Sequence, residues 1–201
     1  MSKINIIILS ASLMALGAFS IDTILPSISY LKNDFNFLPQ NSHWIITSVF
    51  LGIAIGQLVF GPVSDRIGRK KTAIVGLIIF SIGCILSIIS KDYFLFLITR
   101  FLQGLGSGAA VVVSRAMARD FFEGRKLAQI MSLVTTIFIL VPVFAPSIGQ
   151  IIISISNWKI IFVFMLFLST ILKLFIVFKY LEAGKIRDDL RFNSTLRGFV
   201  E

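Results

Sequence analysis

Six long apolar stretches, separated by short polar segments, constrain this chain more than any other feature of its sequence. Each stretch is close to the ~20 residues that an α-helix needs to cross a bilayer. We therefore expect six membrane-spanning helices, at residues 4–30, 44–60, 72–90, 93–114, 127–155 and 158–180. The stretches lack the alternation of a barrel strand of about ten residues, and a helix satisfies its own backbone hydrogen bonds within lipid.

The composition supports the same fold class. With 56% hydrophobic and only 14% charged residues, a chain of 201 residues cannot hide its apolar surface in one soluble core. The predicted protein is an all-α integral membrane protein, and its first partner is the lipid bilayer. Residues 1–180 are expected to form the six-helix bundle, and the charged segment 181–201 a cytoplasmic linker or tail.

The net charge of +9 could indicate nucleic-acid binding, but its distribution argues against that partner. If the N-terminus is cytoplasmic, the inward segments hold thirteen of the 19 Lys and Arg residues and the outward segments hold three. This asymmetry predicts that both termini are cytoplasmic. Four aromatic residues then lie at the outer boundary, where amphipathic rings favour the headgroup region: Tyr30, Trp44, Tyr93 and Trp158.

Several chemistries lack the residues that they need. The sequence has no Gly-Lys-Ser/Thr phosphate loop, no His/Cys ligand set and no serine nucleophile elbow. The single cysteine, Cys84, lies in the middle of a span and is interpreted as a packing residue. We expect no catalytic residue, no metal and no cofactor.

Two charged residues lie well inside the spans, Asp22 and Arg100. A charge at that depth is unfavourable by about 2.5–3.5 kcal/mol on insertion scales, so each calls for a partner or an aqueous cavity. Asp22 lies about 27 Å along the first span and Arg100 about 10 Å from the outer start of the fourth, which places both in the outer part of the core. They form either a purely structural ion pair or a site in which a protonatable Asp22 is coupled to Arg100, to bound substrate and to helix rearrangement.

Other residues near these charges have simpler interpretations. Gln103 follows Arg100 by one turn, and Gly104 and Gly108, also one turn apart, are typical of close helix packing. Arg115 and Lys173 lie nearer the inner surface, and we expect their side chains to reach along the lipid towards it.

The fifth apolar stretch contains Pro142, Pro146 and Gly149. Proline removes a backbone donor and clashes with the preceding turn, so the helix is expected to kink or to unwind locally. The bend is either a tolerated irregularity or a hinge that lines a cavity.

Residues 61–71 read Gly-Pro-Val-Ser-Asp-Arg-Ile-Gly-Arg-Lys-Lys, a short basic hairpin between the second and third spans. This segment resembles the signature between helices two and three of the major facilitator superfamily. Four further segments resemble the drug/proton antiporters of the bicyclomycin- and chloramphenicol-resistance (Bcr/CflA) group, in family order and over essentially the whole chain: residues 21–26, 100–104, 114–124 and 145–149.

The resemblance implies a set of functional residues. It ties Arg100 to the central cavity and to proton coupling, and we expect Asp22 and Gln103 to belong to the same site. The hairpin motif comprises Gly61, Asp65, Arg66, Gly68, Arg69 and Lys70, in which Asp65 and the arginines form a charge relay. The antiporter motif of helix five comprises Pro142, Pro146 and Gly149, and the second cytoplasmic loop contributes Arg115, Arg119 and Asp120. The motif departs from the family pattern at Gln150, which places a large polar side chain where close packing is expected.

The resemblance also implies an architecture and a function. Family members have twelve helices in two halves, each a 3+3 inverted repeat, with the substrate site between the halves. This chain resembles the N-terminal half, so we expect a proton-coupled exporter of small hydrophobic drug-like compounds in the bacterial inner membrane that is truncated or split. Its partner is then a separate C-terminal half or a second copy. The alternatives are a non-transporting membrane remnant or interaction protein, and a nutrient importer of the same superfamily.

Overall fold

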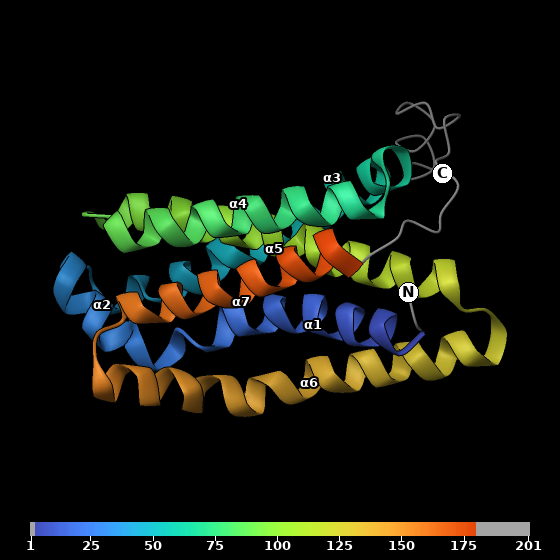
Figure 1. Ribbon diagram of the computed structural model, residues 1–201. Helices are drawn as coiled ribbons and strands as arrows, with labels where there is room; N and C mark the ends of the chain where they lie inside the picture. The colour runs from blue at the N-terminus through green and yellow to red at the C-terminus, as the bar shows by residue number, and fades with distance from the viewer. Residues whose placement is uncertain (1–2, 180–201) are drawn as a thin grey trace.

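The computed structural model describes residues 3–179, and within them it is entirely helical (Figure 1). The elements in chain order are α1 (Lys3–Asp22), η1 (Leu25–Ser27), α2 (Ile28–Phe35), η2 (Pro39–Asn41), α3 (His43–Ile67), α4 (Arg69–Ile89), α5 (Tyr93–Phe121), α6 (Gly124–Ile155) and α7 (Lys159–Lys179). The predicted linker or tail, residues 181–201, lies outside the described residues.

Six segments of these elements are long and apolar enough to cross a membrane, which confirms the predicted all-α membrane fold. The ends differ from the predicted spans, because α3 continues to Ile67 and α5 to Phe121. Most of the segment predicted as a hairpin loop is therefore helix. A helix can extend past the apolar core because its backbone hydrogen bonds are internal, and water and headgroups there solvate its charged side chains. Only Gly68 separates α3 from α4, with a φ of 93° that favours glycine.

The first span is broken near its outer end. α1 stops at Asp22, and the chain passes through η1 before α2 begins. In a continuous helix the carbonyl of Asp22 would accept a bond from the backbone nitrogen of Pro26, which carries no hydrogen. The Ser27 N–H and its hydroxyl both donate instead to the carbonyl of Ile24, at 2.9 and 2.6 Å, and close the 3₁₀ turn. The sequence-based interpretation had a single uninterrupted helix here.

α5 is the central helix of the bundle. It packs most extensively against α3, α4 and α1, and 67% of its span is buried. α6 lies at the edge against α1, with 11% of its span buried, and α7 packs mainly on α4 (Figure 1). The first three spans contain α1, α3 and α4, and the last three contain α5, α6 and α7. The second helix of each set packs on the first helix of the other set, α3 on α5 and α6 on α1, as an inverted repeat requires.

Glycines allow the backbones of α3 and α5 to touch. A Cβ atom built on Gly104 of α5 would collide with the backbone of Val49, and one built on Gly108 would lie 2.6 Å from the carbonyl oxygen of Ile53. On α3, a Cβ atom on Gly56 would lie 2.5 Å from the carbonyl oxygen of Leu105. The predicted role of Gly104 and Gly108 in close helix packing is confirmed.

The end of the bundle opposite the hairpin is closed by aromatic side chains. Trp158 is only 4% exposed and packs with Phe35, Phe96 and Phe162, while its indole N–H donates to Oδ2 of Asp34 at 2.6 Å. Trp158 lies directly before α7, at the end of the span where it was predicted, but its ring is buried in the core, where it joins α2 to α7 and is not exposed to headgroups.

The other aromatic residues at that end differ in exposure. Tyr30 and Trp44 are about half exposed, as residues of an interfacial belt are, whereas the hydroxyl of Tyr93 donates to the backbone carbonyl of Asn41.

Candidate functional site

Arg100, on α5, carries a guanidinium that is completely buried, with 0% of the residue exposed. Its Nη1 donates to Oε1 of Gln103, and its Nη2 donates to the backbone carbonyl of Ser20 on α1. Its Cζ lies 5.7 Å from the centre of the Phe162 ring on α7, an arrangement that attracts a cation. Its Nε has no hydrogen-bond partner among the described residues. Amide and carbonyl dipoles and a ring therefore surround this charge.

Gln103 connects the buried arginine to α4. While its amide oxygen accepts from Arg100, its Nε2 donates to Sγ of Cys84 at 3.3 Å and to Oγ of Ser87 at 3.5 Å. A Cβ atom on Gly83 would lie 2.7 Å from the Gln103 side chain, so this glycine makes room for it. Cys84 was interpreted as a packing residue, and the structure adds a hydrogen bond that ties it to the site.

Asp22 does not pair with Arg100. No ion pair of Asp22 is found within residues 3–179, and the guanidinium contacts the carbonyl of Ser20 instead. The interpretation as a structural ion pair is therefore wrong. The comparison of depths placed the two residues at one level, but it contained no information on the direction in which each side chain points. Asp22 is half-buried at the last residue of α1, where the first span breaks.

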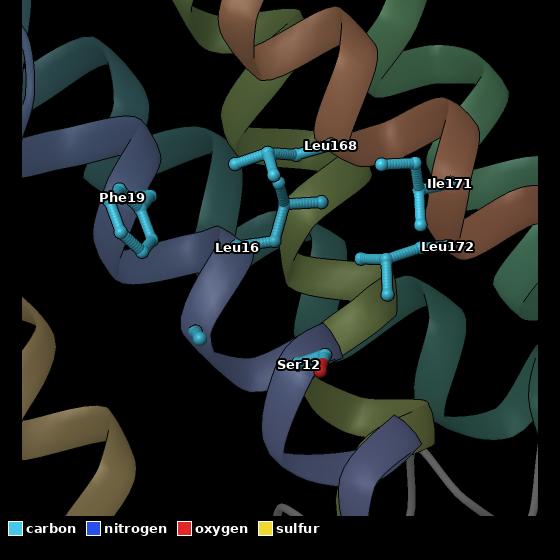
Figure 2. Close-up of a pocket in the computed structure, with 7 residues that line it drawn as sticks. Ser12, Leu16, Phe19, Leu168, Ile171 and Leu172 are labelled. Carbon is cyan, nitrogen blue, oxygen red and sulfur yellow. The ribbon is translucent and has the colours of Figure 1, made fainter.

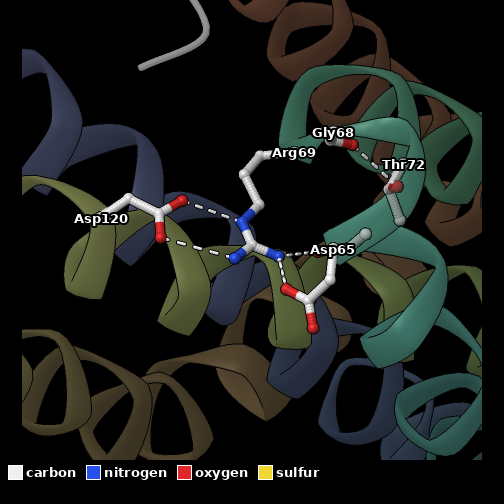
Figure 3. A network of polar contacts seen from close by, with 6 residues as sticks. Asp65, Gly68, Arg69, Thr72 and Asp120 are labelled. Carbon is white, nitrogen blue, oxygen red and sulfur yellow. Dashed lines mark hydrogen bonds and ion pairs between the residues drawn. The ribbon is translucent and has the colours of Figure 1, made fainter. Parts of the chain in front are cut away.

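A second polar group lies where α3, α4 and α5 meet at the hairpin (Figure 3). The Arg69 Nη1 donates to Asp65 Oδ1 and to Ser64 Oγ, each at 2.5 Å. Its Nε donates to Asp120 Oδ2 at 2.9 Å, and its Nη2 contacts Oδ1 of the same carboxylate at 3.4 Å. One guanidinium therefore joins three helices, and we call Ser64, Asp65, Arg69 and Asp120 the hairpin cluster.

The remaining residues of the two predicted cytoplasmic motifs are distributed around this cluster. Gly61 lies within α3, with nothing within 4 Å of the position of a Cβ atom, and Arg66 is half-buried in the last turn of that helix. Lys70 reaches α7. Arg115 and Arg119 are exposed and belong to α5 rather than to a loop.

α6 continues through both of its prolines. Pro142 and Pro146 lie inside one helix that runs from Gly124 to Ile155, so of the two predicted forms, a kink or local unwinding, the unwinding does not occur and the kink stays a prediction. The broken helix of the bundle is the first span. Gly149 faces that break, because a Cβ atom built on it would collide with the carbonyl oxygen of Thr23. Gln150 is exposed, and within residues 3–179 it is not at a closely packed position, contrary to expectation.

Replacing Gly149 by alanine is expected to lower the free energy of unfolding by about 1–3 kcal/mol. The added methyl group meets a backbone oxygen that cannot rotate away, so α6 must move off the break in the first span. Denaturation of the detergent-solubilised protein with SDS measures the change. The matched control is Ser147→Ala, an exposed position one half-turn away that should change stability by less than about 0.5 kcal/mol. Equal stability of Gly149→Ala and the unmodified protein would contradict this close contact.

An apolar pocket of about 240 Å³ lies between α1 and α7 (Figure 2). Ser12 supplies its one hydroxyl, and apolar side chains such as Leu16, Phe19 and Leu172 form the rest of the lining. Neither Asp22 nor Arg100 is among the lining residues, so the pocket is separate from the charged groups.

The functional partners that sequence reasoning missed carry no motif of their own. The carbonyl of Ser20, the ring of Phe162 and the thiol of Cys84 come from three different helices. One local signal was available, since the opposite charges of Asp65 and Arg69 lie four residues apart, on either side of the turn at Gly68.

The sequence matches a family model described as Major Facilitator Superfamily over residues 7–199. It is 32% identical to a bicyclomycin resistance protein homolog of Haemophilus influenzae over 190 residues, which cover 94% of this chain and 48% of that protein. It is 34% identical to multidrug resistance protein MdtL of Citrobacter koseri over 172 residues, 86% of this chain and 44% of that protein. The chain thus spans about half the length of the curated relatives that it matches.

Solved structures show the same fold. The proton:xylose symporter XylE, at 15% identity, superposes with a TM-score of 0.79 over 90% of this chain and 45% of its own length. The human organic anion transporter MFSD10 superposes with a TM-score of 0.70 at 16% identity, over 96% of this chain and 52% of its own.

Proposed function

Because the chain belongs to the major facilitator superfamily, as its motifs indicated, we propose that it acts as the N-terminal half of a proton-coupled exporter of small hydrophobic drug-like compounds. The names of its relatives, a bicyclomycin resistance protein homolog and multidrug resistance proteins, support the substrate class. Such a protein is a secondary active transporter, driven by the proton gradient without a cofactor. It lies in the bacterial inner membrane with both termini in the cytoplasm.

The observation that carries this proposal is the buried cation of Arg100, which contacts the end of α1 next to the break that follows Asp22. Arg100 is held by the carbonyl of Ser20, two residues before Asp22, so α5 is bonded directly to the end of α1. The guanidinium has no carboxylate partner among the described residues, so its burial is unfavourable. An unfavourable charge inside a membrane span indicates a functional site. Protonation of Asp22 changes the charge beside this contact and in that way biases the position of the α1 end.

The driving force suffices for export. One proton entering a cell releases about 2.3 kcal/mol per 100 mV of membrane potential and about 1.4 kcal/mol per pH unit. Exchanging that proton for a drug molecule supports a substantial outward gradient of drug.

A second six-helix half completes the proposed transporter. The chain covers 48% of one relative and 44% of another, and residues 3–179 leave most of the α6 span uncovered. A non-transporting remnant and a nutrient importer are the competing functions, and the direction and presence of transport distinguish them.

Replacing Asp22 by asparagine is expected to reduce proton-coupled export by roughly tenfold or more, because the amide cannot take up a proton in exchange for substrate. The assay uses everted vesicles of cells that express the full chain together with a second six-helix half, with bicyclomycin as the probe. Proton release on adding the drug, followed with a pH-sensitive dye, measures coupling. Glu123→Gln, at an exposed carboxylate before α6, is the matched control and should retain full activity.

Three outcomes separate the alternatives. Export that needs both halves and fails in Asp22→Asn supports the proposal. Drug movement in the direction of import supports an importer. Absence of transport, whichever six-helix half is co-expressed, supports a remnant. Undiminished coupled export by Asp22→Asn would remove Asp22 from the coupling mechanism.

A further inference from the structure

Helix α4 begins with three consecutive cations, Arg69, Lys70 and Lys71. This placement is unfavourable on its own, because the first turn of a helix carries the positive end of the helix dipole. The preceding Gly68 offers no side chain to cap that turn. Arg69 is compensated by Asp65 and Asp120, whereas Lys71 is exposed to solvent.

Lys70 is compensated in a different way. Its Nζ donates to the backbone carbonyl of Val177 at 3.1 Å. Val177 lies near the end of the described part of α7, which runs from Lys159 to Lys179. This one contact therefore places the charge of Lys70, in the first turn of α4, against a carbonyl dipole of α7.

A second group of polar contacts joins the same two helices deeper in the bundle. The Nζ of Lys173 donates to Oγ of Ser81 at 2.9 Å, and the hydroxyls of Ser81 and Ser169 lie 3.0 Å apart. Both hydroxyls are also bonded to the carbonyl of Leu77. Lys173 is thus directed towards α4, and the prediction that it reaches along the lipid to the surface is wrong. α7 packs far more on α4 than on α6, so it should move with α4.

We propose that Lys70 is a positioning residue that couples the hairpin cluster to the adjacent end of α7. Arg69 and Lys70 are neighbours in the first turn of α4, and one contacts α5 while the other contacts α7. A rearrangement of the cluster that turns this end of α4 also displaces Lys70 and frees the end of α7. This inference depends on the geometry of the hairpin end and not on drug transport.

The test measures how readily the end of α7 opens in the full chain reconstituted in lipid nanodiscs. Ile176 is 1% exposed near this end and Ile161 is 0% exposed near the far end of the same helix. Ile176→Cys and Ile161→Cys, each made with Cys84→Ser, report local opening through their rates of labelling by a water-soluble maleimide. Each reporter is combined with Lys70→Met, Lys70→Arg, Lys71→Met, Asp120→Asn, and the double variant Lys70→Met/Asp120→Asn.

Lys70→Met is expected to raise the labelling rate at position 176 about fivefold, the effect of one lost hydrogen bond, and to leave position 161 unchanged. Lys70→Arg, which keeps a donor and a charge, and Lys71→Met, at the exposed neighbour, should stay near the rate of the unmodified protein. Asp120→Asn should raise labelling at 176 when Lys70 is present and add nothing when Lys70 is methionine.

Three results would overturn the proposal. The first is an unchanged rate at 176 in Lys70→Met. The second is an increase at both 176 and 161, which indicates general loosening of the bundle. The third is an equal effect of Asp120→Asn with and without Lys70, which means that the cluster and the end of α7 respond independently.

Discussion

Replacing Gly104 by valine is expected to prevent the bundle from packing, with a loss of several kcal/mol in the free energy of unfolding. A Cβ atom at this position collides with the carbonyl oxygen of Val49, and its next neighbours are also backbone atoms of α3. Backbone atoms cannot rotate aside as a side chain can, so α3 and α5 must separate. These two helices share the most extensive contact of the bundle, which makes the effect large.

The expected result for Gly104→Val is a protein that elutes as aggregate from size-exclusion chromatography in mild detergent, or that unfolds at much lower SDS concentration. Gly61→Ala is the matched control, since α3 also contains Gly61 and nothing lies within 4 Å of its Cβ position. Alanine is the better helix former by about 0.8–1.0 kcal/mol, so this control should be neutral or stabilising. A Gly104→Val protein as stable as the Gly61→Ala protein would show that α3 and α5 do not approach this closely.

Replacing Arg69 by methionine is expected to lower the free energy of unfolding by about 2–3 kcal/mol, between the values for exposed and buried ion pairs. The variant leaves Asp65 and Asp120 without their shared cation, and Ser64 loses a donor. Two carboxylates then face each other between α3 and α5, and their repulsion opens the hairpin end. SDS denaturation measures the loss, which should grow at low ionic strength because the repulsion is then less screened.

Arg69→Lys should recover only part of the loss, since a single ammonium cannot reproduce the fork that reaches both carboxylates. Lys71→Met removes the exposed cation two residues away and should change stability by less than about 0.5 kcal/mol. In an Asp120→Asn background, Arg69→Met should destabilise less than in the unmodified protein. Strict additivity of the two substitutions would contradict the shared ion cluster.

The hairpin shows how far a local pattern predicts tertiary contacts. Asp65 and Arg69 are close in the chain, on either side of the Gly68 turn, so their contact is local. The other carboxylate, Asp120, is 51 residues away from Arg69, and nothing in the spacing relates the two. The resemblance to a family placed both residues in functional motifs, and the structure showed that one guanidinium joins them.

The two intramembrane charges show the opposite limit. Arithmetic with the helix rise placed Asp22 and Arg100 at one depth, and a structural ion pair was one of the two interpretations that followed. The structure breaks the first span after Asp22, because Pro26 cannot donate to its carbonyl, and it directs Arg100 to the carbonyl of Ser20. A depth estimate assumes an unbroken helix and does not include the rotation of each helix about its axis. The contact of Arg100 depends on the break in the first span and on that rotation.

The sequence by itself determined the membrane class, the number of spans, the positions of the charged motifs and the family. These follow from hydropathy, charge and short motifs, which are properties of neighbouring residues in the chain. Only the tertiary structure decided that glycines join α3 to α5, that Trp158 lies in the core and that Lys70 contacts α7. Such contacts depend on how each helix is rotated about its axis and where it is interrupted. The packing of the whole bundle determines both the rotations and the interruptions.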